Sequence, residues 1–431
     1  MPRMHRAIRL LRFTLRSMSI AGFVIAAACC SSSEEVPAGH AFDVTTDEAG
    51  VIRTVSRGGP KYADSLFTYD AVVTLREDPA REESMLFHPT RIVMDAGGRY
   101  YVEDYGNGRI AVFDPEGNFH HAFGRKGQGP GEFEYPQIVS IENDVITLYD
   151  WMQSRTTRFS TGGELLSVDS HIFEAQSRVR QIYHTPEGKM ILLGEPPIVF
   201  SAFTQYREYR TFIRATVLSA AGDTIATIDT PEVTLGKQFI LEEYGLVAMS
   251  SIYFTGRPSL VYAPGRGLLM STGQEPEVSW YDLGGNLTRV ITIEQEREEV
   301  TADERAAIIQ SSREQIENAE DDARRAMYRR IHELSEIPDT KDHWTDVLVD
   351  DAGFIWLECM PDYTVESSER TATYMVLSPE GEYLGSTAWP LSSGTLSHGH
   401  FLGFRTDEDT GETIGTVFRI LPAVAGLTYP D

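Results

Sequence analysis

The chain has 431 residues, 41% hydrophobic and 24% charged, so it can bury a core, and a disordered or collagen-like polymer is excluded. Its 38 Lys and Arg against 64 Asp and Glu give a formal net charge of −26. That charge would repel nucleic acid and anionic lipid headgroups, which we therefore exclude as partners. Because two of the three Cys are adjacent, neither a disulfide framework nor a thiolate metal cluster is expected.

The N-terminal residues predict an export signal over residues 1–28. They contain five Arg and no acid and end in the apolar stretch Met18–Ala28, which is too short for a bilayer core of about 30 Å. Small residues before Cys29 and polar residues after Cys30 resemble a bacterial lipoprotein cleavage site. The resemblance implies that Cys29 carries the lipid, with Cys30 or plain secretory cleavage as alternatives. A tether over 29–50 and an envelope protein held outside the cytoplasm by lipid alone would follow.

The rest of the chain, residues 51–431, begins with a repeat whose first two copies are offset by 46 residues. Residues 95–117 align without a gap on 141–163, so that Phe113 falls on Phe159. Short alternating strands separated by glycine turns at such a period predict four-stranded propeller blades, with strands A to D running from the axis outward.

The turns give the number of blades. Six A–B turns are expected, at Gly98, Asn143-Asp144, Gly188, Gly267, Gly353 and Gly411. Five C–D turns are expected, at Gly117, Gly163, Gly222, Gly285 and Gly381. The sixth copy lacks a strand D, whereas a spare strand, Ala71–Leu75, precedes the first copy. Pairing this strand beside Gly415–Leu421 would remove the open sheet edges, so the predicted fold class is all-β: a six-bladed β-propeller closed by an N-terminal strand.

The first two copies resemble a known repeat. Residues 87–163, with a Pro before strand A, an Asp ending strand B and Arg-Ile opening strand C, look like NHL-type propeller repeats. The wider layout, including the GQGPGEF stretch and a late blade with DDAGFIW, is similar to a group of bacterial six-bladed β-propeller lipoproteins of unassigned activity. The resemblance implies a fold and an envelope location, and implies no reaction.

The long insertions point to one face of the disc. A–B and C–D turns lie on one face of a propeller, and B–C loops and D–A crossovers lie on the other. The insertions all fall in the second group: Gly194–Arg214, Pro231–Pro258, Gln295–Asp342 and Met360–Thr373. Long loops on a rigid scaffold commonly carry binding, so we predict the working face here; insertions tolerated without function are the alternative.

The largest insertion, about 295–338, is predicted to be helical and to lie between blades four and five. Thr301 and Glu304 fit a capping box, apolar residues then recur at helical spacing, and Pro338 ends the pattern. The helix, or a helical pair broken near Asn318, could be a lid, a docking arm or a brace.

Sequence motifs for catalysis are absent, so no catalytic residue, metal site or cofactor is predicted. The glycine-rich run 124–131 leads into a strand, not a helix, and is expected to serve the crossover. Asp407–Gly411 is interpreted as an acidic A–B turn.

Two acidic residues recur in the first two copies, five positions before an arginine. Asp104 precedes Arg109 and Asp150 precedes Arg155. We interpret both pairs as ion pairs within a blade.

Candidate binding residues are aromatic or histidine side chains near the mouth of the channel: Tyr105, Trp151, Trp344, Tyr363, His398 and His400. Rings around a funnel suit a sugar or a peptide by stacking. The two histidines would alternate on an innermost strand and so point the same way.

The sequence therefore predicts a propeller that binds a small ligand or an envelope protein on its B–C and D–A face. The alternative is a hydrolase or lyase at the channel, possibly calcium-dependent. An enzyme should bring acidic and histidine side chains together at one point of the channel, the candidates being His398, His400, Asp104, Asp150 and Glu358.

Overall fold

The computed structural model describes residues 39–78, 80–170, 178–195, 206–366, 369–406 and 413–430, which belong to one compact unit, Glu35–Asp431. The signal peptide and Cys29 lie outside the described residues, so these predictions are not tested, and the acidic segment 407–411 also lies outside them. None of the described helices is long and apolar enough to cross a bilayer.

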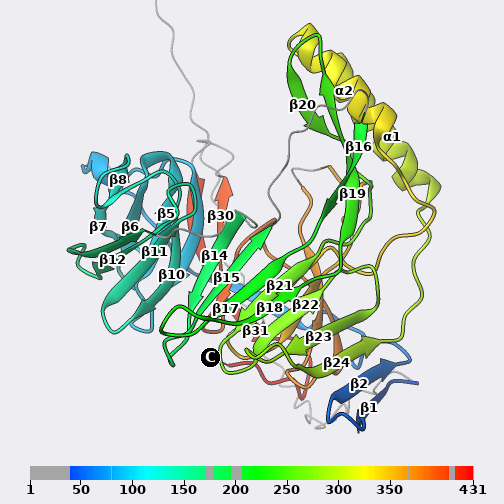
Figure 1. Ribbon diagram of the computed structural model, residues 1–431, viewed down its shortest axis with the longest axis horizontal. Coiled ribbons are helices and arrows are strands. Elements are labelled where there is room, and N and C mark those ends of the chain that lie inside the picture. Colours follow the sequence, from blue (N-terminus) through cyan, green and yellow to red (C-terminus); the bar gives the residue numbers. More distant parts are fainter. Residues whose placement is uncertain are drawn as a thin grey trace, which may run out of the picture. The chain divides into compact units, whose positions relative to one another are not determined.

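Six blades follow one another along the chain, as predicted (Figure 1). Blade 1 contains β4 (Pro89–Met94), β5 (Tyr100–Asp104), β6 (Arg109–Phe113) and β7 (Phe119–Phe123). Blade 2 contains β10 (Pro136–Glu142), β11 (Val145–Asp150), β12 (Arg155–Ser160) and β13 (Leu165–Ser170). Blade 3 contains β14 (Arg178–His184), β15 (Met190–Glu195), β17 (Arg214–Leu218) and β18 (Thr224–Asp229).

The second half of the ring has the same order. Blade 4 contains β21 (Ser259–Ala263), β22 (Gly267–Ser271), β23 (Glu277–Tyr281) and β24 (Leu287–Ile293). Blade 5 contains β25 (Asp346–Val349), β26 (Ile355–Glu358), β27 (Thr373–Leu377) and β28 (Tyr383–Ala388). Blade 6 contains β29 (Thr395–Ser397), β30 (His400–Thr406), β31 (Thr413–Pro422) and, from the N-terminal side, β3 (Phe67–Thr74). The first strand of blade 6, β29, contacts the first strand of blade 1, β4, which closes the ring.

The tight turns are stabilised by one repeated side-chain hydrogen bond. In the first A–B turn, Asp95 Oδ1 accepts the backbone N–H of Arg99 over 2.9 Å, and Gly98 adopts φ +80, which favours glycine. The same bond to the fourth following residue recurs at Asp114, Ser160, Thr185, Ser219, Asp282, Asp350 and Ser378. Blade 2 uses Asn143 and Asp144 instead, both at positive φ, as a two-residue hairpin turn requires.

The core lies between neighbouring blades. Tyr101 and Val112 of blade 1 pack with Ile146 and Leu148 of blade 2. Equivalent clusters join blades 4 and 5, blades 5 and 6, and blades 6 and 1. Burial of one face of each sheet against the next fixes the alternation seen in the strands.

An N-terminal belt, residues 41–74, runs across three blades. β1 (Ala41–Thr46) pairs with β2 (Ile52–Arg57), and β2 adds in parallel to β24 of blade 4. The backbone N–H groups of residues 61, 62 and 66 then donate to carbonyl oxygens of β28 in blade 5. The structure thus places residues 41–46, expected in the tether, in a strand.

The closure of the ring is confirmed. β3 pairs antiparallel with β31 in blade 6, with Ala71 opposite Phe418, and the backbone N–H of Leu75 donates to the Gly415 carbonyl. β3 therefore takes the place of strand D and covers the outer edge of β31.

The strands of blade 6 differ from the prediction in one respect. Its A–B turn lies at His398 and Gly399, both at positive φ, and residues 407–412, which are outside the described residues, fall between β30 and β31 in the sequence. The assignment of Gly411 and the acidic segment to an A–B turn was therefore wrong. Turn-like composition favours the acidic segment, whereas the two-residue hairpin at His398 and Gly399 needs only one glycine.

A cap lies over the face that carries the long insertions (Figure 1). It comprises a three-stranded sheet and two helices: β16 (Tyr206–Thr211), β19 (Val233–Leu241), β20 (Leu246–Met249), α1 (Ala302–Glu317) and α2 (Asp322–Leu334). The helices lie between blades four and five in the chain, as predicted. Thr301 and Glu304 form the expected capping box, and α1 ends at Asn318.

Two further short strands, β8 (Arg125–Lys126) and β9 (Glu132–Phe133), shape the crossover between blades 1 and 2. Short 3₁₀ turns occur at Glu82–Ser84 and Tyr105–Asn107.

Candidate functional site

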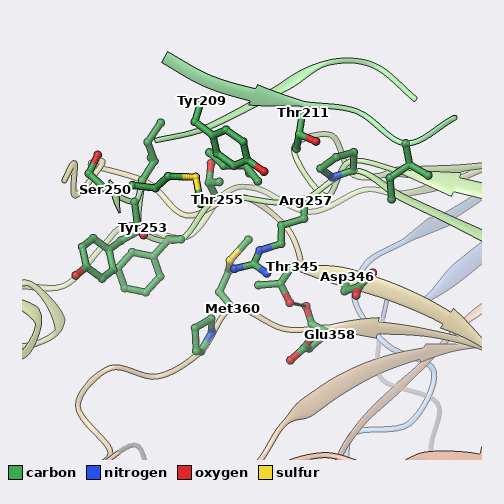
Figure 2. Close-up of a pocket in the computed structure, with 18 of the residues that line it drawn as sticks. Tyr209, Thr211, Ser250, Tyr253, Thr255, Arg257, Thr345, Asp346, Glu358 and Met360 are labelled. Atoms are coloured by element: carbon green, nitrogen blue, oxygen red, sulfur yellow. Dashed lines mark hydrogen bonds between the residues drawn. The ribbon is translucent and has the colours of Figure 1, made fainter. Parts of the chain in front are cut away.

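A cleft of about 600 Å³ lies between the cap and the propeller (Figure 2). Its cap wall includes Tyr209 and Thr211 of β16 and Met249 of β20. Its propeller wall includes Thr345 and Glu358, which flank the hairpin of blade 5 at its B–C and D–A end. The cleft therefore opens on the face that the insertions predicted.

The cap wall is held in place by the helical insertion. Ser250 Oγ donates to the Leu334 carbonyl oxygen over 3.2 Å, and the Tyr253 N–H donates to the Glu336 carbonyl oxygen over 2.9 Å. Lys237 of β19 pairs with Glu336 at 2.5 Å. Because these bonds join the end of α2 to residues that line the cleft, the helices brace the cleft wall.

Tyr363 is the predicted binding residue that lines the cleft. Its ring packs edge-on against Phe254 at 5.0 Å and Tyr253 at 5.3 Å between centroids. Burial raises the pKa of its hydroxyl. Arg370 lies 4.9 Å from the ring centroid, so one ring connects the blade 5 loop to the cap-side crossover.

Arg257 and Glu358 are two of the charged residues that line the cleft. Figure 2 shows the Arg257 side chain extending into the space between Tyr209 and Glu358. Burial raises the pKa of Glu358; the nearby Asp346 carboxylate adds to this, and Arg257 opposes it. Sequence reasoning missed Arg257, because a single arginine before a proline carries no motif.

Tyr105 and Trp151 lie elsewhere on the same face, in a row with Tyr135. Ring centroids are 4.7 Å apart for Tyr105 and Tyr135, and 5.4 Å apart for Tyr135 and Trp151. The guanidinium groups of Arg178 and Arg180 lie 4.4 and 4.5 Å from the Trp151 centroid. We call the rings of Tyr105, Tyr135 and Trp151 the aromatic row. Its central member, Tyr135, lies in a crossover and was not predicted.

Trp344 has no place in a binding surface. Its side chain is 1% exposed in the core between blades 4 and 5, and its indole N–H donates to Ser271 Oγ over 2.8 Å. The sequence position at the entry to strand A was correct, but the ring turns inward between the blades. We therefore remove Trp344 from the candidate binding residues.

His398 and His400 do not share a strand. His398 lies in the A–B turn of blade 6 at φ +48, where its backbone N–H donates to Asp351 Oδ2 over 2.6 Å. His400 begins β30, with Nδ1 2.6 Å from the His398 carbonyl oxygen. Both belong to the turn face, opposite the cleft, so the expected alternation toward the channel was wrong.

The first predicted ion pair is present. Asp104 is fully buried and accepts from Arg109 Nε over 2.8 Å and from the Phe87 N–H over 2.8 Å. These bonds tie the end of strand B to strand C and to the chain entering the blade.

The second pair is replaced by bonds to the backbone. Asp150 accepts four backbone N–H groups, from Glu134, Tyr135, Met152 and Gln153. Arg155 donates to carbonyl oxygens of Gln128, Gly129 and Glu132, and no ion pair joins it to Asp150 among the described residues. The glycine-rich run is thus held as a crossover, as expected.

A second cavity, of about 350 Å³, lies among the strands of blades 6, 1 and 2 and is lined by Arg91, Glu103 and Gln137 among others. Of the residues named for a channel site, none lines it. Among the described residues, no three His, Cys, Asp or Glu side chains are grouped so as to hold a metal ion. Glu358 lies in the cleft, Asp104 and Asp150 are bound within blades 1 and 2, and the histidines occupy a turn.

Comparisons with known proteins agree with this architecture. Residues 81–196 match the model of a family described as a 6-bladed beta-propeller. No curated protein matches the sequence. Similar solved structures include a Bacteroides fragilis protein thought to be exported, with 12% identity, a TM-score of 0.46, and coverage of 83% of this chain and 96% of that chain.

Two others are comparable in coverage. A member of the DUF4221 family from Bacteroides vulgatus has 11% identity, a TM-score of 0.47, and coverage of 83% of this chain and 99% of its own. Virginiamycin B lyase from Staphylococcus aureus has 10% identity, a TM-score of 0.38, and coverage of 81% of this chain and 99% of its own.

The fold and the site together define the class: a six-bladed β-propeller with a helical insertion and a capped cleft on its loop face.

Proposed function

We propose that this chain is a binding protein whose ligand occupies the cleft between the cap and blade 5. The observation that carries the proposal is that residues of blades 3 and 5, the crossover before blade 4 and the cap sheet all line one cavity. Its volume suits a small organic ligand or a short peptide, and its walls combine aromatic rings with a few charged groups. The five side chains named for a channel enzyme are dispersed, which supports binding over catalysis.

The test fills the cleft. Met249 lines the cleft from β20 and is 42% exposed, so a Trp at this position should occupy the cavity without disturbing the core. Val247 is the matched control: it has the same exposure on the same strand and does not line the cleft. Ligands from a library of oligosaccharides and short peptides that stabilise the wild type in thermal unfolding should lose their effect in Met249→Trp and keep it in Val247→Trp. Equal loss or equal retention in both variants contradicts the site.

The aromatic row is proposed as a second contact surface on the same face. Planar rings at spacings of 4.7 and 5.4 Å offer stacking to sugars or to aromatic side chains of a partner. Tyr105→Ala and Trp151→Ala should then weaken binding of an extended ligand, and unchanged affinity in both would remove the row from the site.

We further propose, from the sequence, that Cys29 is lipidated and holds the protein in the bacterial envelope outside the cytoplasm. Cys29→Ser combined with Cys30→Ser should move the protein to the soluble fraction and abolish labelling by a radioactive fatty acid. Retention of the double variant in the membrane fraction contradicts this.

A further inference from the structure

Arg257 is the single basic residue among the described residues that line the cleft. Its side chain is exposed to the cavity, and within the described part of the chain no hydrogen bond or ion pair engages its guanidinium. In a chain with a net charge of −26, an arginine without a carboxylate partner inside a cleft requires an explanation.

Its basic neighbours are paired. Lys237 binds Glu336 at 2.5 Å, Arg297 binds Asp342 at 3.1 Å, and Lys341 binds Glu304 at 2.8 Å. The cap thus neutralises these cations with its own acids and leaves Arg257 to the solvent of the cleft.

The backbone that carries Arg257 is firmly fixed. Its N–H donates to the Thr345 carbonyl oxygen over 3.1 Å, and the Gly256 N–H donates to Asp342 Oδ2 over 2.9 Å. A Cβ on Gly256 would lie 2.3 Å from the Thr272 carbonyl oxygen, so the segment is packed against blade 4. Phe254, buried at φ +52, holds a strained left-handed conformation just before it. These contacts fix the backbone from which the Arg257 side chain extends into the cleft.

The acids of the cleft are engaged elsewhere. Asp346 Oδ1 accepts from Ser259 Oγ over 2.5 Å and from the Val347 N–H over 2.7 Å. Glu195 lies 3.7 Å from Arg180. Glu358 faces Arg257 without forming a close ion pair among the described residues, and its burial disfavours the charged form.

We propose that the ligand of the cleft carries a carboxylate, which the Arg257 guanidinium binds while the body of the ligand packs against Tyr209 and Met360. This deepens the proposed function and rests on it. A guanidinium presents two parallel N–H donors that match a carboxylate, which a neutral group cannot replace. A peptide C-terminus and a uronic acid share this chemistry.

The experiment compares acids with neutral analogues of the same shape. The probes are 3-phenylpropionate against 3-phenylpropionamide, a free-acid tripeptide against its C-terminal amide, and glucuronate against glucose, each titrated by ligand-observed NMR. For at least one pair, the acid should bind wild type at least tenfold tighter than its analogue. Arg257→Gln should remove this preference, and Arg257→Lys should retain part of it. Because no bond within the described residues depends on the guanidinium, the melting temperature of Arg257→Gln should equal that of wild type.

Glu358→Gln should change the affinity for the acid in the opposite direction to Arg257→Gln. Removing the carboxylate that faces Arg257 should tighten binding of the acid several-fold and leave the neutral analogue unchanged. The peptide and uronate pairs show which source of carboxylate the cleft takes.

Equal affinity of acid and analogue in every pair, no binding of any acid, or an acid preference that survives Arg257→Gln overturns the inference. The proposed function is judged separately: ligands that Met249→Trp excludes and Val247→Trp retains would still define the cleft as a binding site even if they are neutral.

Discussion

The carboxylate of Glu103 in blade 1 accepts a hydrogen bond of 2.7 Å from the backbone N–H of Ile138 in blade 2. Arg91 Nη1 donates to the carbonyl oxygen of the same residue over 3.3 Å. Ile138 stands at a register shift between β10 and β11, where the regular ladder is interrupted. Two side chains of blade 1 thus bind the N–H and the carbonyl oxygen of Ile138 in blade 2.

Replacing Glu103 should reveal this contact in stability. Glu103→Leu leaves the Ile138 N–H without an acceptor and should lower the free energy of unfolding by about 1–3 kcal/mol in urea titrations. Glu103→Gln keeps an acceptor and should lose much less. Equal losses in the two variants would show that the charge, not the hydrogen bond, matters.

The pH dependence of Glu103→Gln should also differ from wild type. Burial raises the pKa of Glu103 above its ordinary value of 4.5, although Arg91 opposes the shift. Folding therefore favours the protonated form, and this group's contribution to stability falls as pH rises from below 4.5 through the raised pKa. As pH rises above 4.5, the free energy of unfolding of Glu103→Gln should fall less than that of wild type. A parallel pH profile contradicts the assignment.

Trp344→Ala should act through stability, not through binding. Removing a ring that is 1% exposed leaves a cavity between blades 4 and 5 and should cost about 3–5 kcal/mol. Trp344→Phe fills most of the space and loses the bond to Ser271, so it should cost less. Thermal unfolding with and without a cleft ligand separates the two effects: the ligand-induced shift in melting temperature should remain in Trp344→Phe.

Trp151 should be the tryptophan that solvent reaches. The other four, Trp280, Trp344, Trp356 and Trp389, are at most 4% exposed. Iodide should quench one component of the fluorescence, aided by the positive charges of Arg178 and Arg180. Trp151→Phe should abolish that component, and Arg178→Gln should weaken quenching by iodide more than quenching by neutral acrylamide. An iodide-sensitive component in Trp151→Phe would contradict the burial of the others.

Deleting residues 301–337 and bridging the gap with Gly-Ser should open the cleft while the blades stay folded. The bonds from Leu334 and Glu336 to the cap strands would be lost, but the strand pairings of the blades do not include this segment. Far-ultraviolet circular dichroism should retain its β signal while ligands of the cleft stop stabilising the protein. Loss of the β signal would instead show that the helices brace the whole propeller.

The sequence predicted the blades well because each one is specified locally. A side chain such as Asp95, four residues before the N–H it accepts, and a glycine such as Gly98 define a hairpin within one short segment. Ring closure was also predictable, since a missing strand and a spare strand leave one pairing open.

The site was only partly predictable, because its geometry depends on contacts distant in the sequence. Tyr363 was expected at the face, but the partners that place it, Tyr253 and Phe254, lie more than 100 residues earlier. Trp151 follows strand B of blade 2 and Trp344 precedes strand A of blade 5, so both lie at the same end of a blade, yet the Trp344 ring turns into the core and the Trp151 ring does not. No local sequence pattern distinguishes a ring that turns into the core from one that does not. No local pattern indicated that the Arg257 guanidinium lacks an ion-pair partner among the described residues.

The N-terminal belt also sets the order in which this chain can reach its native state. Its strands are synthesised before their partners, which are residues 287–293, 383–388 and 413–422. Blades 1 to 5 each have four strands from one continuous part of the chain, whereas blade 6 remains unfinished until β3 meets β31. The pairing of β3 with β31 closes a loop that spans almost the whole propeller, so it is the strand pairing with the largest loop-closure entropy. A chain without residues 41–74 would lose the strand pairings to β24 and β31 and the backbone hydrogen bonds to β28, which belong to three different blades.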